Sequence, residues 1–127
     1  MLPLKHKRLW LVLSVLLVAY VVYGSLAPDP PIEAPGNYDK LEHFFVYLLL
    51  AVWFTALFPR GRYWVVVVGL LVLGLAMELL QQWMDLGRIG DPLDMTANAA
   101  GIASGVAMAL AGIGGWARKV EAWLSRN

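Results

Sequence analysis

Residues 78–105, ELLQQWMDLGRIGDPLDMTANAAGIASG, decide the fold of this chain, because two apolar runs meet there across a short polar connection. The polar residues near the facing ends of the two runs are Glu78, Gln81, Gln82, Asp94 and Asn98. A carboxylate at the centre of a membrane helix costs about 2.5 to 3.5 kcal/mol on insertion scales, so such residues usually face the interior of a bundle. The stretch therefore predicts a polar site, or a polar contact, between two membrane helices.

The composition is that of a membrane protein. The chain has 127 residues, of which 60% are hydrophobic and 15% are charged, and its mean hydropathy is +0.64. A soluble domain of this size would be far less apolar. The sequence contains no cysteine, which excludes disulfides, thiol catalysis and thiolate metal sites. The net charge of +1 indicates nothing about partners.

Four apolar segments are long enough to cross a membrane, and we expect a single domain over residues 1–127. The expected fold is all-α, an integral membrane four-helix bundle with helices at about residues 9–27, 39–58, 63–84 and 94–115. A helix of about 18 residues covers about 27 Å, close to the ~30 Å hydrocarbon core. The prolines and the glycine in residues 27–37 predict a loop after the first helix.

The first apolar segment has a second interpretation, as a secretory signal peptide with the small residues Ser25 and Ala27 at its cleavage site. The apolar run exceeds the usual length of about 7 to 15 residues in a signal peptide. Pro28 directly after the cleavage position also disfavours cutting. We therefore expect an uncleaved first helix.

The C-terminal residues 116–127 show helical spacing of apolar side chains, at Trp116, Val120, Trp123 and Leu124. Basic residues occupy several of the positions between them. This pattern predicts an amphipathic tail that lies along the membrane surface. A frayed chain end is the alternative.

Small residues recur every four positions in the fourth expected helix, at Ala97, Gly101, Gly105 and Ala109. Such a stripe lets the backbone of a neighbouring helix approach closely. The pattern does not say whether that neighbour belongs to the same chain. Packing within one chain is the simpler interpretation, and a homo-oligomer through the face of Gly101 and Gly105 is the alternative.

The basic residues predict the orientation of the bundle. Because the loops alternate sides, eight of the ten Lys and Arg residues fall on one side, and only Lys40 and Arg88 fall on the other. The positive-inside rule assigns the larger group to the cytoplasm, so we expect both termini to be cytoplasmic. Most of the acids fall on the outer side, where we expect the function of the protein to reside.

Helical spacing places three polar rows at this outer end. The row on the second helix is Asp39, His43 and Tyr47. The row on the third helix is Glu78, Gln81, Gln82 and Asp85. The row on the fourth helix is Asp94 and Asn98, followed by Gly101 and Gly105. Burying these rows against one another is the least costly way to satisfy them in a bilayer.

These motifs resemble the VanZ-like family. The matching stretches are DKLEHFFVY at residues 39–47, ELLQ at residues 78–81 and RIGDPLDMTANAAGIASG at residues 88–105. The resemblance covers about residues 9–115, and its one departure is the doubled amide, which leaves open whether Gln81 or Gln82 fits the pattern. It implies a multi-pass protein of the bacterial cytoplasmic (inner) membrane and cell envelope. The namesake of the family is associated with resistance to the glycopeptide antibiotic teicoplanin.

The polar rows supply candidates for two roles. His43 and Glu78 are the candidate catalytic acid and base, with water as the nucleophile. The residues expected to bind a ligand are Asp39, Lys40, Tyr47, Gln81, Gln82, Arg88, Asp94 and Asn98. Helix capping is the alternative role of Asp39 and of Asp94. A histidine among carboxylates can bind a divalent metal, but no zinc-type spacing is present, so we assign no metal and expect no cofactor.

Two functions fit this pattern. The first is a site, open to the outer leaflet, that binds or acts on an anionic membrane lipid or a lipid-linked envelope precursor. Outward helix N-termini together with Lys40 and Arg88 favour an anion there. The second is a non-enzymatic scaffold or partner subunit whose polar cluster only fixes the helix packing. Nucleic-acid binding has no support, because the basic residues form short clusters beside membrane helices.

Overall fold

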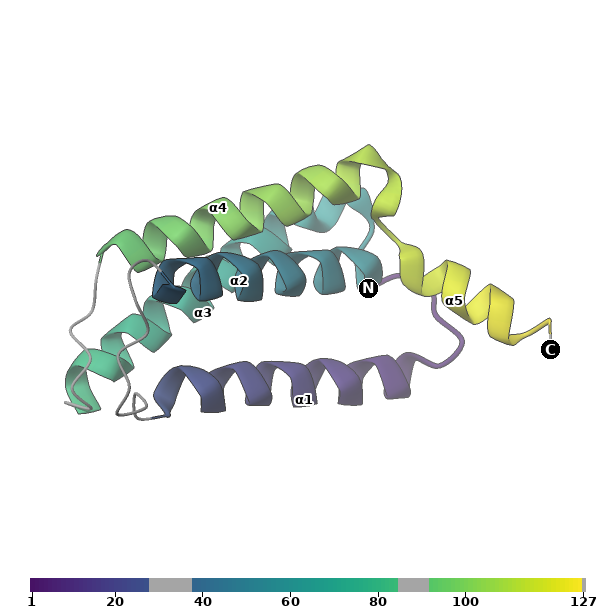
Figure 1. Ribbon diagram of the computed structural model, residues 1–127. Coiled ribbons are helices and arrows are strands. Elements are labelled where there is room, and N and C mark those ends of the chain that lie inside the picture. Colours follow the sequence, from purple (N-terminus) through teal and green to yellow (C-terminus); the bar gives the residue numbers. More distant parts are fainter. Residues whose placement is uncertain (28–37, 85–91, 127) are drawn as a thin grey trace.

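A computed structural model of the chain describes residues 1–27, 38–84 and 92–126, and all regular elements in these ranges are helical. The elements are α1 (Lys7–Leu26), α2 (Tyr38–Leu57), the 3-10 turn η1 (Arg60–Arg62), α3 (Tyr63–Met84), α4 (Pro92–Met108), the π-helical turn η2 (Ala109–Ile113) and α5 (Trp116–Leu124). Helices α1 to α4 run alongside one another, and α5 extends from one end (Figure 1). The prediction of an all-α fold is confirmed.

Four helical segments are long and apolar enough to cross a membrane: Lys7–Leu26, Tyr38–Leu57, Arg60–Met84 and Leu93–Ile113. Large apolar side chains are exposed along each of them, as at Leu16, Leu49, Val72 and Leu110. A soluble protein rarely exposes a continuous apolar surface on this scale. The structure therefore supports the prediction of a multi-pass membrane protein.

Helices α2 and α4 make the closest contact in the described structure. A Cβ atom at Gly101 would overlap the backbone carbonyl of Phe44. A Cβ atom at Gly105 would lie 2.6 Å from Ala51 Cβ and 2.8 Å from the carbonyl oxygen of Leu48. The small-residue stripe thus packs within one chain, and an oligomer through this face would have to displace α2.

The fourth helix is shorter than expected from the sequence. Regular α-helix ends at Met108, whereas the expected helix continues to residue 115. A π-helical turn follows, in which Gly112 has a φ of 127°, and Gly115 after it has a φ of 71°. Glycine adopts positive φ without the steric cost that a Cβ atom imposes. These glycines let the chain leave the bundle axis and enter α5.

The C-terminal tail is a docked helix rather than a frayed end. Ala117 of α5 is fully buried in a cluster with Leu2, Leu4, Trp10 and Leu57. The side chains of Trp123 and Leu124 are exposed, so they do not belong to the face of α5 that packs on the bundle. The docked helix excludes a frayed end, and contact of Trp123 and Leu124 with the membrane surface stays a prediction.

Three indole rings hold α1, α2 and α5 together. The centroids of Trp10, Trp53 and Trp116 lie 5.6 to 5.7 Å apart in tilted or edge-to-face pairs. Each indole N–H also donates a hydrogen bond, that of Trp53 to Ser14 Oγ at 2.9 Å and that of Trp116 to the carbonyl of Val52 at 3.2 Å. Burying an indole is favourable when its N–H has such a partner.

Glu121 of α5 anchors the N-terminal segment. Its carboxylate accepts the backbone N–H groups of Lys5 and His6, each at 2.7 Å, and the indole N–H of Trp10 at 3.0 Å. Burial by itself raises the pKa of the Glu121 carboxyl, but these hydrogen bonds and the nearby His6 outweigh burial and hold the pKa below its ordinary value. The ionised carboxylate is therefore the form that ties the two termini together.

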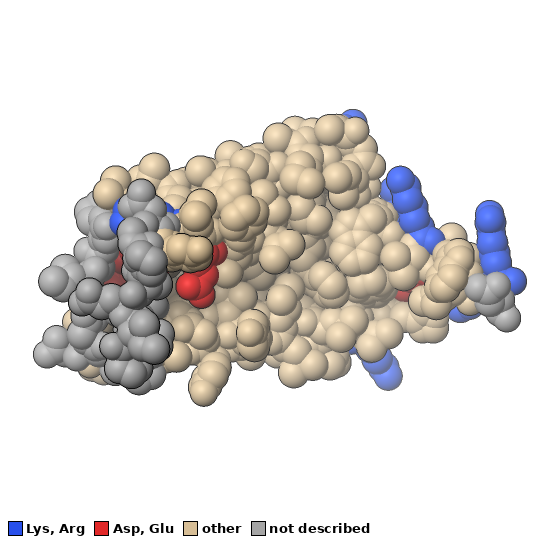
Figure 2. Space-filling view, viewed as in Figure 1, with Lys and Arg blue, Asp and Glu red and all other residues tan. Residues whose placement is uncertain are grey.

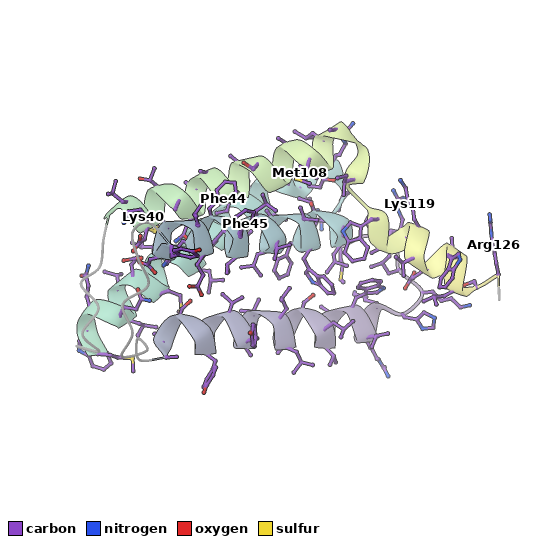
Figure 3. All side chains as sticks on the ribbon, in the orientation of Figure 1. Lys40, Phe44, Phe45, Met108, Lys119 and Arg126 are labelled. Carbon is purple, nitrogen blue, oxygen red and sulfur yellow. The ribbon has the colours of Figure 1, made fainter. Side chains whose placement is uncertain are left out.

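Charge is sorted between the two ends of the molecule. The described basic residues at the α5 end are Lys5, Lys7, Arg8, Arg60, Arg62, Arg118, Lys119 and Arg126. Figure 2 shows basic side chains gathered at this end and acidic side chains toward the other. Figure 3 labels Lys40 at the opposite end from Lys119 and Arg126. We call the end of the bundle next to α5 the basic end, and the opposite end the Lys40 end.

We expect Gly101→Ala to lower the thermal melting temperature in detergent, because the new methyl group pushes α4 away from α2. Overpacking of this kind typically costs about 1 to 3 kcal/mol. The matched control is Gly69→Ala on α3, where a Cβ atom would meet nothing within 4 Å. Equal melting temperatures for the two variants would show that the close contact between α2 and α4 does not stabilise the fold.

We expect Glu121 to make stability dependent on pH. Because the folded pKa lies below the unfolded value near 4.5, the anchor contributes fully above that pH and is lost as the pH falls through the folded pKa. Wild type should therefore melt above Glu121→Gln at pH 7, and the difference should shrink on acidification below about pH 4.5. Thermal melts of both proteins across this range measure the effect, and a difference that grows on acidification would contradict it.

Candidate functional site

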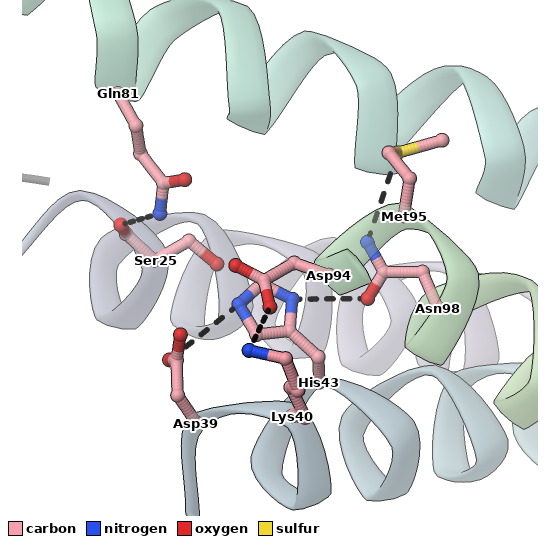
Figure 4. A network of polar contacts seen from close by, with 8 residues as sticks. All are labelled: Ser25, Asp39, Lys40, His43, Gln81, Asp94, Met95 and Asn98. Atoms are coloured by element: carbon pink, nitrogen blue, oxygen red, sulfur yellow. Dashed lines mark hydrogen bonds and ion pairs between the residues drawn. The ribbon is translucent and has the colours of Figure 1, made fainter. Parts of the chain in front are cut away.

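Polar side chains from α2, α3 and α4 meet at the Lys40 end (Figure 4). The N-terminal turns of α2 and α4 lie side by side there, because the glycine contact holds the two helices together. The C-terminal half of α3 completes the group. The predicted site residues that are buried at this end are Tyr47, Glu78, Gln81, Asp94 and Asn98.

His43 connects α2 to α4. Its Nδ1 atom lies 3.0 Å from the side-chain oxygen of Asn98, which is buried at 1% exposure. Its Nε2 atom lies 3.8 Å from Asp39 Oδ1, one helical turn earlier on α2. Because an amide oxygen only accepts hydrogen bonds, Nδ1 carries a proton, and Nε2 is the nitrogen that faces the acid. The roles of His43 and Glu78 as catalytic acid and base stay a prediction.

Two acids lie at helix N-termini. Asp39 belongs to the first turn of α2 and Asp94 to the first turn of α4. The residues that precede both helices lie outside the described ranges, so the alternative role of these acids as helix caps stays a prediction. The positive end of each helix dipole still favours a carboxylate there. The ammonium of Lys40 lies 3.9 Å from Asp94 Oδ1, which makes a second link between α2 and α4.

Tyr47 and Glu78 lie deeper in the bundle and are buried at 2% and 6% exposure. The Tyr47 hydroxyl has no hydrogen-bond partner within the described ranges. Space for it comes from Gly74 of α3, where a Cβ atom would lie 3.3 Å from this hydroxyl and 3.0 Å from Asn98 Nδ2. The sequence analysis missed Gly74, although its position four residues before Glu78 puts it on the polar face of α3.

The two neighbouring glutamines of α3 have different surroundings in the structure. Gln81 is buried, and its side-chain N–H donates to the carbonyl of Ser25 at 2.7 Å, so it connects α3 to the end of α1. Gln82 is exposed and lies away from the buried polar group. Of the remaining predicted residues, Arg88 and Asp85 lie outside the described residues.

A pocket of about 120 Å³ opens between α1 and α2 beside this polar group. The α2 side of its lining consists of Asp39, Glu42, His43, Val46 and Tyr47. The α1 side consists of Tyr20, Val21, Gly24 and Ser25. Charged groups near one end of the lining thus adjoin apolar and aromatic side chains further along the helices.

A second, larger groove of about 330 Å³ lies in the apolar part of the bundle, and most of its lining belongs to α3. Its lining comes from α1, α2 and α3 and consists of Val18, Phe54, Phe58, Val65, Val66, Gly69, Leu70 and Leu73. All of these residues are apolar, so the groove can accept only apolar groups. Helix α1 therefore borders one pocket with polar walls and one with apolar walls.

Asp39, His43 and Asp94 could together hold a metal ion. One ligand atom from each residue lies within 4.8 Å of the ligand atoms of the other two. Asp39 is exposed, His43 is half-buried and Asp94 is buried, so the group extends from the surface into the bundle. The three residues come from two helices that are adjacent in space but distant in the sequence.

Comparison with known proteins gives no family for this chain. No protein-family model, no curated protein and no solved structure matches it. The VanZ-like resemblance stays a prediction.

Proposed function

We propose that this protein binds the headgroup of an anionic membrane lipid, or of a lipid-linked envelope precursor, at the Lys40 end of the bundle. The pocket between α1 and α2 carries this proposal, because its lining joins titratable side chains to apolar ones. A lipid at a membrane surface presents the same order, with a charged headgroup above apolar chains. The apolar groove between α1, α2 and α3 offers a place for an acyl chain.

The helix ends beside the pocket favour a negative group. The N-termini of α2 and α4 both lie at the Lys40 end, and the first N–H groups of a helix carry a partial positive charge. Lys40 adds a full positive charge in the same region and is only partly exposed. An ammonium acts as a flexible point charge, which suits a phosphate or a carboxylate.

We infer the orientation from the sorting of charge. The basic end carries all of the described Lys and Arg residues except Lys40, and the positive-inside rule assigns such an end to the cytoplasm. The Lys40 end then faces the outer leaflet, and both termini are cytoplasmic. We place the protein in the bacterial cytoplasmic membrane by its resemblance to the VanZ-like family. On the same ground, the proposal extends to an effect on teicoplanin tolerance.

A structural role is the second candidate, and specific contacts favour it. The hydrogen bonds of His43 with Asn98 and of Gln81 with the Ser25 carbonyl connect helices without any ligand. Hydrogen bonds between membrane helices average about 0.6 kcal/mol, so several of them can fix one packing. In this case the protein would be a scaffold or partner subunit, and its melting temperature would not respond to lipid headgroups.

We expect phosphatidylglycerol to raise the melting temperature of the detergent-solubilised protein above its value with phosphatidylcholine. A ligand at 100 times its Kd stabilises a folded protein by about 2.7 kcal/mol. Lys40→Gln should lose most of this rise, because it removes the charge beside the pocket. Lys119→Gln, which removes an exposed charge at the basic end, should keep it.

Two outcomes would contradict the proposed function. If neither lipid changes the melting temperature of wild type, the polar group is structural and the scaffold interpretation holds. If Lys119→Gln loses the rise as completely as Lys40→Gln, the lipid is attracted by general charge and not by the pocket.

A further inference from the structure

We infer that Asp39, His43 and Asp94 form a binding site for a divalent transition-metal ion. Their ligand atoms already lie within 4.8 Å of one another. Atoms that share an ion at about 2.1 Å stand about 3 to 4 Å apart, so the site closes by side-chain rotation alone. No movement of α2 against α4 is needed, because the glycine contact already holds the two helix ends together.

The histidine is prepared for this role by Asn98. Metal-bound histidines usually donate their second N–H to a carbonyl or carboxylate, which fixes the ring and its tautomer. The Nδ1 atom of His43 makes such a bond to the buried side-chain oxygen of Asn98 at 3.0 Å. In the neutral ring the lone pair is then on Nε2, which faces Asp39 Oδ1 at 3.8 Å. Two electron-rich atoms in this arrangement attract a cation between them.

The chemistry of the ligands selects the class of ion. One imidazole and two carboxylates suit Zn²⁺, Mn²⁺ or Fe²⁺ better than Ca²⁺, which prefers six to eight oxygen ligands. Three protein ligands also leave coordination positions open, as in catalytic rather than structural sites. Asp39 and His43 line the pocket between α1 and α2, so the open positions face it.

A buried polar group without a hydrogen-bond partner lies close to the ligand set. Tyr47 lines the pocket at 2% exposure, and its hydroxyl finds no hydrogen-bond partner in the parts of the chain that the structure describes. A buried hydroxyl normally has a partner. A Cβ atom at Gly74 would lie 3.3 Å from this hydroxyl and 3.0 Å from Asn98 Nδ2, so the hydroxyl lies toward α3 and α4, beside the amide that contacts His43.

The contact of Lys40 with Asp94 shows that a positive charge is favourable beside this ligand set. Its ammonium lies 3.9 Å from Asp94 Oδ1, on the side chain that the ion would also contact. The ammonium and a divalent ion repel each other, so Lys40 weakens metal binding. Removal of Lys40 should therefore strengthen the binding of a metal, whereas it should weaken the binding of an anion.

The ion also explains how an anionic headgroup could bind among acids, a step that rests on the proposed function. The pocket is lined by the acids Asp39 and Glu42, and Asp94 lies at the ligand set with Lys40 as the basic side chain there. Glu78 is a further acid, buried close to Tyr47. A divalent ion would cancel the negative charge that Asp39, Glu42 and Asp94 leave in excess of Lys40. Its open positions would hold a phosphate oxygen directly, so lipid binding would depend on the metal.

The test is a titration of the chelator-treated full chain in uncharged detergent with Mn²⁺ alone. Binding is measured as the loss of the free Mn²⁺ signal in electron paramagnetic resonance. Wild type should bind one ion per chain. Asp39→Asn and Asp94→Asn should each lower the affinity at least tenfold. Lys40→Met should raise it severalfold. The matched control is Glu42→Gln, which removes an exposed carboxylate of the same pocket and should change the affinity less than threefold.

Several results would overturn the metal site. These are the absence of saturable Mn²⁺ binding to wild type, an equal loss of affinity in Glu42→Gln and Asp39→Asn, and a fall in affinity in Lys40→Met. Asp39 is exposed, so Asp39→Asn keeps the test valid even if Asp94→Asn fails to fold. Ca²⁺ at the same concentration should not displace Mn²⁺, and displacement would contradict the assigned class of ion.

A lipid arm separates this inference from the proposed function. Phosphatidylglycerol should raise the melting temperature of the Mn²⁺-loaded protein more than that of the chelator-treated protein. If Mn²⁺ binds as expected but the lipid has no effect in either form, the metal site stands and the lipid function fails. If the lipid stabilises both forms equally and Mn²⁺ does not bind, the lipid function stands and the metal site fails.

Discussion

The direct contact between the backbones of α2 and α4 is the constraint on which the polar end depends. Gly101 and Gly105 remove the side chains that would keep the two helices apart. The close approach sets the N-terminal turns of both helices side by side, and each brings an acid into a region of positive dipole potential. A separation larger by one methyl group would lengthen the contacts of His43 with Asn98 and of Lys40 with Asp94.

The two ends of the bundle are held in different ways. At the basic end, three indole rings and the Glu121 carboxylate make a compact set of contacts that fixes both termini. At the Lys40 end, α1 is held mainly through the bond from Gln81 to the Ser25 carbonyl, and the space beside it is the polar pocket. Helix α1 is thus fixed at the basic end and borders a pocket of about 120 Å³ at the other.

The sequence predicted the parts of the site that follow from spacing within one helix. Asp39, His43 and Tyr47 share a face of α2 because residues four apart lie above one another, whatever the neighbouring helices do. The Gly101 and Gly105 pair also indicated a close helix contact. Gln82 could not be separated from Gln81 in this way, because the two differ by about 100° around α3 and only its packing decides which is buried.

Contacts between helices could not be predicted from spacing, because they depend on the register and rotation of whole elements. The ligand set of Asp39, His43 and Asp94 is of this kind, since Asp94 comes from α4, which α3 separates from α2 in the chain. Glu121 is another, because its three N–H partners belong to the opposite end of the sequence. Only the break after α4 had a visible signal, in the glycines at positions 112, 114 and 115.

The proposed lipid and metal sites require the pocket to open at the outer membrane surface, where headgroups and ions can reach it. The absence of natural cysteine permits a direct test with Glu42→Cys beside the pocket and Lys119→Cys at the basic end. Each variant would be exposed in bacterial spheroplasts to a maleimide that does not cross membranes. If the Lys40 end faces outward, Glu42→Cys is labelled at once and Lys119→Cys is labelled only after permeabilisation. The reverse pattern would contradict the orientation, and with it the outer-leaflet site.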